Sequence, residues 1–425
     1  MTLLLVLATI LVTLFLNIPI GFVIAFAGLM IIWLDGGAPL SSFIQSSFNG
    51  VNSFSLLAVP LFVLAGELMN VGGIAKRIVD FARTIVGSFT GGVGLIAIVA
   101  SLIFAAISGS AVATAAAIGA IMIPIMKDAG YKAPYAATLV ASAGSLGPVI
   151  PPSIVFILYG VMANVSIGGL FIGGIIPGLL MATVLIVVNY IISKKEGYVG
   201  DQRSSLKDIL RELNNAKWAL LAPVIILGGI YAGVFTPTEA SVIAVVYSLI
   251  ISLFVYKELK FKDIPRVFMQ SSLTTGSILI IVGTAIFFGR MLALERVPQM
   301  VSDFITGIST NPIVILLMIN VFLLLVGMFM ETIAGLLIFV PILLPIAKSI
   351  GVDPLHFGII VGLNLAMGFF TPPVGINVFV TSRIAQISFD STYKYLALFV
   401  FAFLFVLAVV TYIPEISLFL PKLLQ

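Results

Sequence analysis

Two segments of the sequence have residue types and a spacing that could bind a cation inside a membrane. They read Gly147-Pro148-Val149-Ile150-Pro151-Pro152 and Gly368-Phe369-Phe370-Thr371-Pro372-Pro373, and each lies within a long apolar stretch. Proline lacks an N–H and blocks the helical hydrogen bond, so each Pro-Pro pair frees carbonyl groups upstream of it. Freed carbonyls within a membrane need a partner, and a dehydrated Na⁺ prefers oxygen ligands. A simple proline kink is the alternative, but two breaks of one pattern favour ion binding.

A second source of oxygen ligands is the run of small residues from Ser108 to Thr114. Small residues let helices approach closely, and the hydroxyls of Ser108 and Ser110 could bind a cation, with close packing as the alternative. A similar position near Gly327 to Thr332 contains Glu331, which is costly to bury and which we expect to be solvated at the mouth of a hairpin. Five more polar residues flank the breaks. Each alone is more often a helix-packing residue, but together we expect them to form a solute-binding surface: Ser142, Ser145, Ser153, Asn364 and Asn377.

The composition identifies the class of protein in which these residues act. Of the 425 residues, 61% are apolar and 9% are charged, against about 45–50% and about 25% in soluble proteins. A soluble enzyme, a nucleic-acid binder and a disordered chain are therefore excluded, which leaves an all-α polytopic membrane protein. One histidine and no cysteine exclude multi-histidine and thiolate metal sites. The sequence has no P-loop and no H-E-x-x-H motif, so we predict a protein that is not an enzyme and whose transport energy comes from an ion gradient or another chain.

Long apolar stretches predict the elements that must position the two breaks. Stretches 132–164 and 355–388 are too long for one plain helix and contain the Pro-Pro pairs, so we predict a broken helix in each. Stretches 92–126 and 312–347 carry polar residues at their centres, and we predict re-entrant hairpins because a lipid-exposed break would leave backbone groups unpaired. Plain membrane-crossing helices are expected at about 2–16, 18–34, 50–70, 168–193, 216–233, 238–256, 267–289 and 394–413.

The two halves of the chain are predicted to be inverted repeats. At an offset of 221 residues Gly147 pairs with Gly368, and the Pro-Pro pairs also match. Each half, 1–193 and 216–425, holds five crossings and one hairpin, and an odd number of crossings gives the halves opposite orientations. Residues 194–215 form a cytoplasmic linker. Inverted repeats with broken helices are typical of secondary transporters, with the site near the midplane, where the positive ends of half-helices suit an anionic solute.

Several segments resemble one known family. The run Ala106-Ile107-Ser108-Gly109-Ser110 and the segments 145–153, 235–240 and 368–375 are similar to motifs of the large membrane subunit of tripartite ATP-independent periplasmic (TRAP) transporters, the DctM/SiaM-like proteins. The resemblance covers essentially the whole chain. It implies an elevator mechanism driven by Na⁺, in which hairpins and broken helices form a transport domain that moves against a scaffold.

The resemblance further implies two Na⁺ sites. The residues of this sequence that match the first Na⁺ site of the family are Ser108, Gly147, Ile150 and Pro152, and Ser110 is a further candidate ligand at the same tip. Its second site carries over to Gly327, Gly368, Thr371 and Val374. Members often have a longer serine run at the first hairpin tip, whereas Ala111 follows Ser110 here.

The resemblance also implies the partners and the solute. A periplasmic binding protein delivers a small anionic, carboxylate-bearing solute, such as a dicarboxylate, sialic acid or a similar sugar acid, at the bacterial inner membrane. A small membrane subunit works with the chain, and it is expected on a separate chain because nothing in the sequence resembles it. The alternative is a stand-alone Na⁺- or H⁺-coupled anion symporter of related fold. A passive channel would need one continuous polar stripe, which the sequence does not show.

The orientation in the membrane follows from the basic residues. Most of the 21 lysines and arginines fall on one predicted face, which is therefore cytoplasmic, and both termini are predicted to be periplasmic. We expect a cysteine introduced into 194–217 to react with thiol reagents only from the cytoplasm, and one placed after Leu420 to react from the periplasm. The native chain has no cysteine, so the background is clean. Labelling of the first cysteine by an impermeant reagent in intact cells would contradict this topology.

Overall fold

The computed structural model describes residues 2–16, 18–35, 39–201 and 203–424, and this part of the chain is helical with no strand. Nine helices within it are long and apolar enough to cross a membrane. The expectation of an all-α membrane protein is thus confirmed. The expected position of the two termini concerns Met1 and Gln425, which lie outside the described residues.

The described residues of the first half form ten α-helices, and the two expected interruptions of this half fall between them. The chain breaks after Ser108, between two apolar helices, and again from Ser145 to Ser153. The helices are α1 (Thr2–Phe15), α2 (Ile20–Asp35), α3 (Ser41–Val51), α4 (Ala58–Val71), α5 (Ile74–Val86), α6 (Gly92–Ser108), α7 (Ala111–Asp128), α8 (Ala133–Gly144), α9 (Ile154–Ala163) and α10 (Ile167–Glu196).

The second half follows a similar order. Its interruptions fall at Met330–Glu331 and from Phe369 to Gly375. The helices are α11 (Leu206–Tyr231), α12 (Pro237–Ile250), α13 (Ile264–Leu294), α14 (Val297–Ile308), α15 (Pro312–Phe329), α16 (Thr332–Ser349), α17 (Pro354–Gly368), α18 (Ile376–Ala385), α19 (Tyr393–Tyr412) and α20 (Glu415–Leu424).

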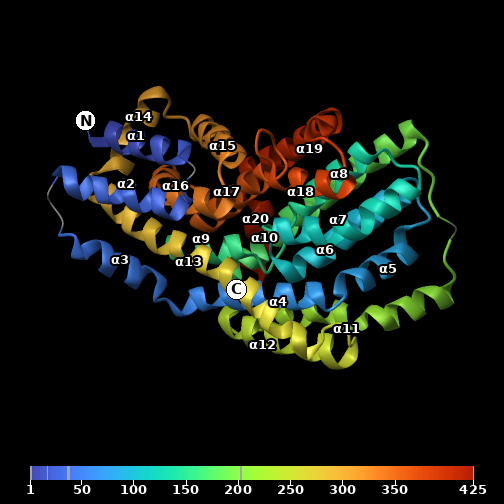
Figure 1. Cartoon of the computed structure of the whole chain (residues 1–425). Helices are drawn as coiled ribbons and strands as arrows, with labels where there is room; N and C mark the ends of the chain where they lie inside the picture. Colours follow the sequence, from blue (N-terminus) through green and yellow to red (C-terminus); the bar gives the residue numbers. More distant parts are fainter. Residues whose placement is uncertain (1, 17, 36–38, 202, 425) are drawn as a thin grey trace.

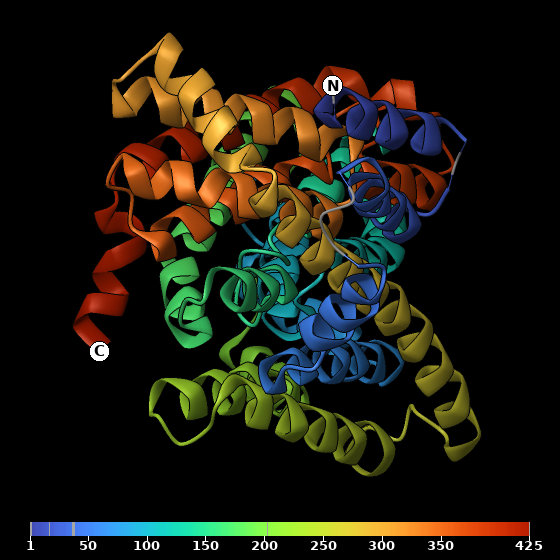
Figure 2. The same ribbon diagram turned by 90° about the vertical axis from the view of Figure 1, so that its left-hand side faces the viewer.

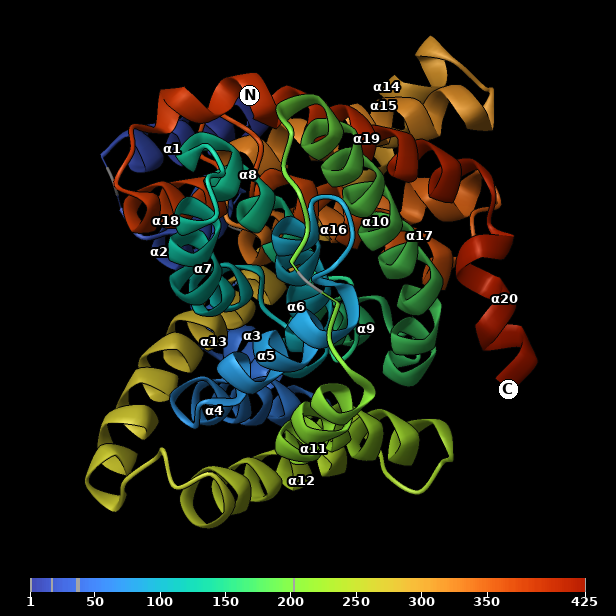
Figure 3. The ribbon, with the colours of Figure 1, turned by 90° about the vertical axis from the view of Figure 1, so that its right-hand side faces the viewer.

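The helices gather into two groups that meet at the interruptions. In one group α13 packs against α2, α3 and α4, while α12 packs on α4 and α11 on α5. In Figure 3 the helices α4, α11, α12 and α13 lie on one side of the molecule, and α7, α8, α10, α17 and α19 lie on the other. Figure 2 shows the opposite face of the same arrangement. The helices α2–α5 and α11–α13 are called the scaffold group below. The helices α6–α9 and α15–α18 are called the hairpin group.

The hairpin group has crossed packing. Helix α9, which follows the first break, packs against α16 and α17 of the second half. Helix α18, which follows the second break, packs against α7 and α8 of the first half (Figure 1). Each broken helix therefore begins beside the hairpin of its own half and ends beside the hairpin of the other half, so the two breaks lie between the two hairpins.

A buried polar network fastens the second hairpin to its neighbours. Asn364 Nδ2 of α17 donates to Asn320 Oδ1 of α15 at 2.8 Å, and Asn320 Nδ2 donates to Thr411 Oγ1 of α19 at 3.0 Å. His356 Nε2 lies 3.3 Å from the Thr411 carbonyl oxygen. Buried polar groups without water need partners of this kind, so the network fixes α15, α17 and α19 against one another.

Each helix break is pressed against the tip of the neighbouring hairpin. A Cβ added to Gly147 would lie 2.5 Å from the carbonyl carbon and oxygen of Ser110, at the tip between α6 and α7. A Cβ added to Gly368 would collide with the carbonyl group of Gly327, near the tip between α15 and α16. Only glycine allows backbones to approach this closely. The glycine of each Gly-x-x-x-Pro-Pro motif therefore sets the distance between break and tip.

We expect Gly147→Ala to destabilise the protein by about 1–3 kcal/mol, because the new methyl group meets rigid backbone and not a flexible side chain. Gly276→Ala on α13 is the matched control, since no atom lies within 4 Å of its added Cβ. The measurement is the melting temperature of each variant purified in detergent. If both alanine variants melt at the same temperature, the tight contact at Gly147 does not hold the hairpin and the break together.

Candidate functional site

Each Pro-Pro pair frees two carbonyl groups, and one of the two finds a new partner. In the first break the Pro148 carbonyl accepts a hydrogen bond from Ser153 Oγ at 2.5 Å. In the second break the Phe369 carbonyl accepts one from the Asn377 N–H at 2.8 Å. Within the described part of the chain, the Gly147 carbonyl accepts no hydrogen bond, and the Gly368 carbonyl accepts only a long one of 3.4 Å from the Thr371 N–H. The glycine carbonyls are thus the oxygens left available for a cation.

The tip of the first hairpin is a cluster of hydroxyl groups. Ser108 Oγ lies 2.8 Å from Thr114 Oγ1, and Thr114 Oγ1 donates to the Ser110 carbonyl at 2.8 Å. Ser110 caps α7, because its Oγ accepts from the Ala113 N–H at 3.4 Å. Gly109 turns the chain with a φ of +59°, a conformation that suits glycine. Ser108 and Thr114 are buried, so the protein shields most of this oxygen cluster from solvent.

The first break and the first tip bring together three of the residues that the resemblance assigned to a Na⁺ site. Gly147 contacts the Ser110 backbone, and a Cβ on Gly109 would lie 2.5 Å from the Pro152 carbonyl oxygen. Ser108, Gly147 and Pro152 therefore lie around one place. The side chain of Ile150 points elsewhere and packs on Gly178 of α10, so only its backbone could contribute an oxygen. Hydroxyl and carbonyl oxygens of this kind fit a hard cation.

The second break encloses a small cavity of about 10 Å³, near the lower limit for holding one water molecule. Gly327, Gly368 and Val374 line it, together with Glu331. The Val374 N–H donates to the Met328 carbonyl at 3.3 Å, which ties the break to the second tip.

Thr371 adjoins this cavity in sequence, and its Oγ1 donates to the Met367 carbonyl at 2.7 Å. The proton of Thr371 is thereby engaged, while the lone pairs of its oxygen remain free to accept.

Two buried amides provide a test of whether the surroundings suit a cation. Asn364 precedes Gly368 by one helical turn. Asn377 lies in the first turn of α18, and its Nδ2 donates to the Ala141 carbonyl at 3.0 Å. Both side chains are fully buried, and the Oδ1 of each lacks a hydrogen-bond partner in the described structure. Buried acceptors without partners are rare. The excess of acceptors near both breaks fits a positively charged ligand.

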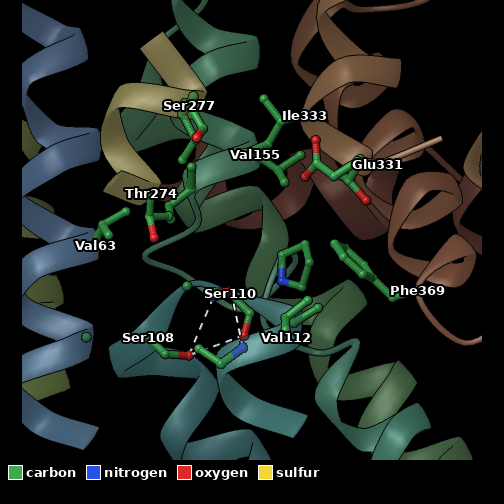
Figure 4. Close-up of a pocket in the computed structure, with 18 of the residues that line it drawn as sticks. Val63, Ser108, Ser110, Val112, Val155, Thr274, Ser277, Glu331, Ile333 and Phe369 are labelled. Carbon is green, nitrogen blue, oxygen red and sulfur yellow. Dashed lines mark hydrogen bonds between the residues drawn. The ribbon is translucent and has the colours of Figure 1, made fainter. Parts of the chain in front are cut away.

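A cavity of about 480 Å³ separates the hairpin group from the scaffold group. Figure 4 shows Thr274 and Ser277 on one side of it, Glu331 and Phe369 on another, and the Ser108–Ser110 tip beside them. Glu67 and Asn70 of α4 also line it. Its size is that of a small-molecule site, and apolar walls with a few polar groups are typical of such sites.

The charges around this cavity come from carboxylates and helix ends. Glu67 and Glu331 are the charged side chains among the described residues that line it, and none of those residues is lysine or arginine. The N-termini of α7 and α16 reach the cavity, and Glu331 Oε2 caps α16 by accepting from the Ala334 N–H at 3.1 Å. Helix N-termini carry partial positive charge, so they supply the attraction for an anion that basic side chains would otherwise supply.

The five polar residues expected to bind the solute stand outside the lining of the large cavity, and the Ser142 Oγ lacks a hydrogen-bond partner in the described structure. Each of them is fully buried. Ser153 caps α9 and Ser145 Oγ donates to the Ser142 carbonyl at 2.6 Å. Asn364 and Asn377 bond to neighbouring helices as described above. A polar residue in an apolar sequence can bind a solute or join helices, and only the packing decides which.

Sequence reasoning missed the scaffold wall of the cavity. Glu67, Asn70, Thr274 and Ser277 lie within stretches predicted as plain membrane-crossing helices and were not singled out as site residues. Glu331 was expected to be solvated at a hairpin mouth, whereas it is only partly exposed, caps α16 and faces the cavity. Glu67 and Asn70 lie three residues apart on one helix face, which is the one signal that could have identified them.

Comparison with known proteins places this geometry in a family. Residues 7–416 match the model of the tripartite ATP-independent periplasmic transporter, DctM component. The chain is 43% identical over 404 residues to the isethionate TRAP transporter permease protein DctMQ of Oleidesulfovibrio alaskensis, covering 95% of this chain but 64% of that protein. It is 41% identical over 410 residues to the sialic acid TRAP transporter large permease protein SiaM of Vibrio cholerae, covering 96% of each. The C4-dicarboxylate TRAP transporter large permease protein DctM of Pseudomonas aeruginosa is 42% identical over 375 residues, covering 88% of each.

Solved structures support the fold. The YdaH transporter of Alcanivorax borkumensis superposes with a TM-score of 0.63 at 12% identity, covering 87% of this chain and 88% of that one. MtrF of Neisseria gonorrhoeae superposes with a TM-score of 0.60 at 13% identity, covering 89% and 85%. The fold is thus shared with transporters, and the identities and coverage of the TRAP permeases confirm the resemblance noted in the sequence. The chain belongs to the DctM family, the large membrane permease component of tripartite ATP-independent periplasmic transporters.

Proposed function

We propose that this permease couples the inward movement of Na⁺ to the uptake of a small organic anion across the inner membrane. The observation that carries the proposal is the large cavity, which the hairpin group and the scaffold group line from opposite sides. A solute held there contacts the hairpin tips on one side and α4 and α13 on the other.

An elevator movement explains this division of the lining. The hairpin group, fastened by crossed packing and by the Asn320–Asn364 network, would move as one body past α4 and α13 and carry the solute with it. Glycine, serine and alanine at the first tip, from Ser108 to Ala111, leave a smooth surface there for such a movement. The corresponding breaks, tips and glycine contacts of the two halves support an inverted-repeat origin.

Two Na⁺ ions are the proposed coupling substrates. The first would bind where the hydroxyl cluster of Ser108 and Ser110 meets the carbonyls of Gly147, Ile150 and Pro152. The second would bind in the small cavity at Gly327, Gly368 and Val374, with the Thr371 oxygen beside it. Each ion would satisfy glycine carbonyls that the Pro-Pro pairs leave without helical partners, and its charge would favour an anion at the adjacent helix N-termini.

The solute is proposed to be a small anion with a carboxylate or a related acid group. The relatives are named for isethionate, sialic acid and C4-dicarboxylates, all of which are organic anions. A periplasmic binding protein would deliver the solute, and a small membrane subunit would accompany the permease. The alternative, a stand-alone anion symporter, shares the cavity and the breaks but would transport without a binding protein.

We expect uptake into liposomes to require the permease, the small subunit and the solute-loaded binding protein together, and an inward Na⁺ gradient. The gradient is needed because none of the described residues that line the cavity is a basic side chain that could hold the anion. Uptake of radiolabelled solute is the measurement, with an equal K⁺ gradient as the control. Equal uptake in K⁺ would refute the Na⁺ coupling, and uptake without the binding protein would favour the stand-alone symporter.

We expect Thr371→Val to lower the apparent Na⁺ affinity by roughly 10- to 100-fold, because a hydrogen-bond-strength contact to a charged group is worth about 1.5–3 kcal/mol. Folding should survive, since a membrane hydroxyl contributes only about 0.6 kcal/mol on average. Thr381→Val is the matched control: its buried Oγ1 also donates to a carbonyl one turn back, at 2.9 Å, but lies outside both cavities. Uptake against Na⁺ concentration is the measurement. An unchanged half-saturation in Thr371→Val would remove Thr371 from the site.

A further inference from the structure

The large cavity and the small cavity share a wall. Four residues line both of them: Glu331, Thr332, Phe369 and Ile376. Glu331 is the charged residue of this wall, and it stands between the place proposed for the second Na⁺ and the place proposed for the solute. In Figure 4 its carboxylate is directed toward Val155, on the side of the large cavity.

We propose that Glu331 supplies the fixed negative charge that retains Na⁺ in the small cavity. This inference rests on the proposed function, because it assigns a residue to one of its two ion sites. The glycine carbonyls and the Thr371 hydroxyl are neutral ligands, so a cation held by them alone would leave its charge unbalanced inside the membrane. A buried charge of this kind needs a partner, and among the described residues that line the small cavity Glu331 is the one with a charge.

The competing explanation is that Glu331 serves only as the N-cap of α16. Its Oε2 accepts from the Ala334 N–H, and capping by an acidic residue stabilises a helix start without any ion. Capping, however, needs only an acceptor oxygen, which glutamine also provides. The two explanations therefore differ in what happens when the charge is removed and the oxygen is kept.

The experiment measures the melting temperature of the full chain, purified in detergent, over a NaCl titration in which KCl keeps the ionic strength constant. A unit charge within about 8 Å of an ion, at an effective dielectric constant of about 20, changes the affinity of that ion by more than 10-fold. We expect Glu331→Gln to raise the half-saturating Na⁺ concentration by about 10-fold, while the melting temperature in KCl alone stays at the wild-type value because the cap is retained. Glu331→Asp keeps the charge and should stay within about 2-fold of wild type.

Glu239→Gln is the matched control, because Glu239 caps the start of α12 by accepting from the Thr236 N–H at 2.8 Å and lines neither cavity, and its Na⁺ titration should follow the wild-type curve. An unchanged titration in Glu331→Gln overturns the inference and leaves Na⁺ coupling intact. An equal loss in Glu331→Asp also overturns it, since the charge would then not matter. Absence of any Na⁺ effect in the wild-type protein refutes the proposed function itself. Should Glu331→Gln not fold, Glu331→Asn replaces it, because asparagine is a strong neutral N-cap.

Discussion

The contact between a helix break and a hairpin tip, made once in each half, is the constraint on which the rest of the structure depends. Gly147 against Ser110 and Gly368 against Gly327 bring two interrupted backbones to a distance that excludes any side chain. Each interruption exposes carbonyl groups that lipid cannot satisfy, and the contact removes them from lipid without fully pairing them. The candidate ion sites are a direct result of this compromise between close packing and incomplete hydrogen bonding.

The electrostatics of the large cavity follow from the same interruptions. With carboxylates and no basic side chain among its described lining residues, the cavity would attract the proposed anion only through the N-termini of helices that begin at the tips. A lysine or arginine would hold an anion whether or not a cation was present. Helix ends carry only partial charge, so they would bind an anion weakly on their own. The affinity for the anion would then depend on whether a cation is bound nearby.

The sequence predicted the elements that rest on local chemistry. Gly-x-x-x-Pro-Pro indicated the breaks, and the small residues from Ser108 to Thr114 indicated an interruption that the structure places at Gly109. The sequence could not show which polar residues face the cavity. Thr274 and Ser142 are both hydroxyl-bearing residues in apolar stretches, and they differ only in the helices that pack against them. Glu331 was expected at a solvated hairpin mouth, and its place in a cavity wall could not be read from the sequence, because the other residues of that wall, such as Thr274 and Ser108, lie far away in the chain. The amphipathic helix α3 and the terminal α20 were not foreseen, because neither is long or apolar enough to read as a crossing.

The crossed packing of α9 and α18 has a consequence for biogenesis. During synthesis the N-terminal half leaves the ribosome and enters the membrane first, but the partners of α9 are α16 and α17 of the second half. The short helix α9 therefore lacks these contacts in the bilayer until α16 and α17 have been synthesised and inserted. A chain that stops before α16 would leave the helix that follows the first break without its second-half neighbours, although every residue of the first candidate ion site had already been made.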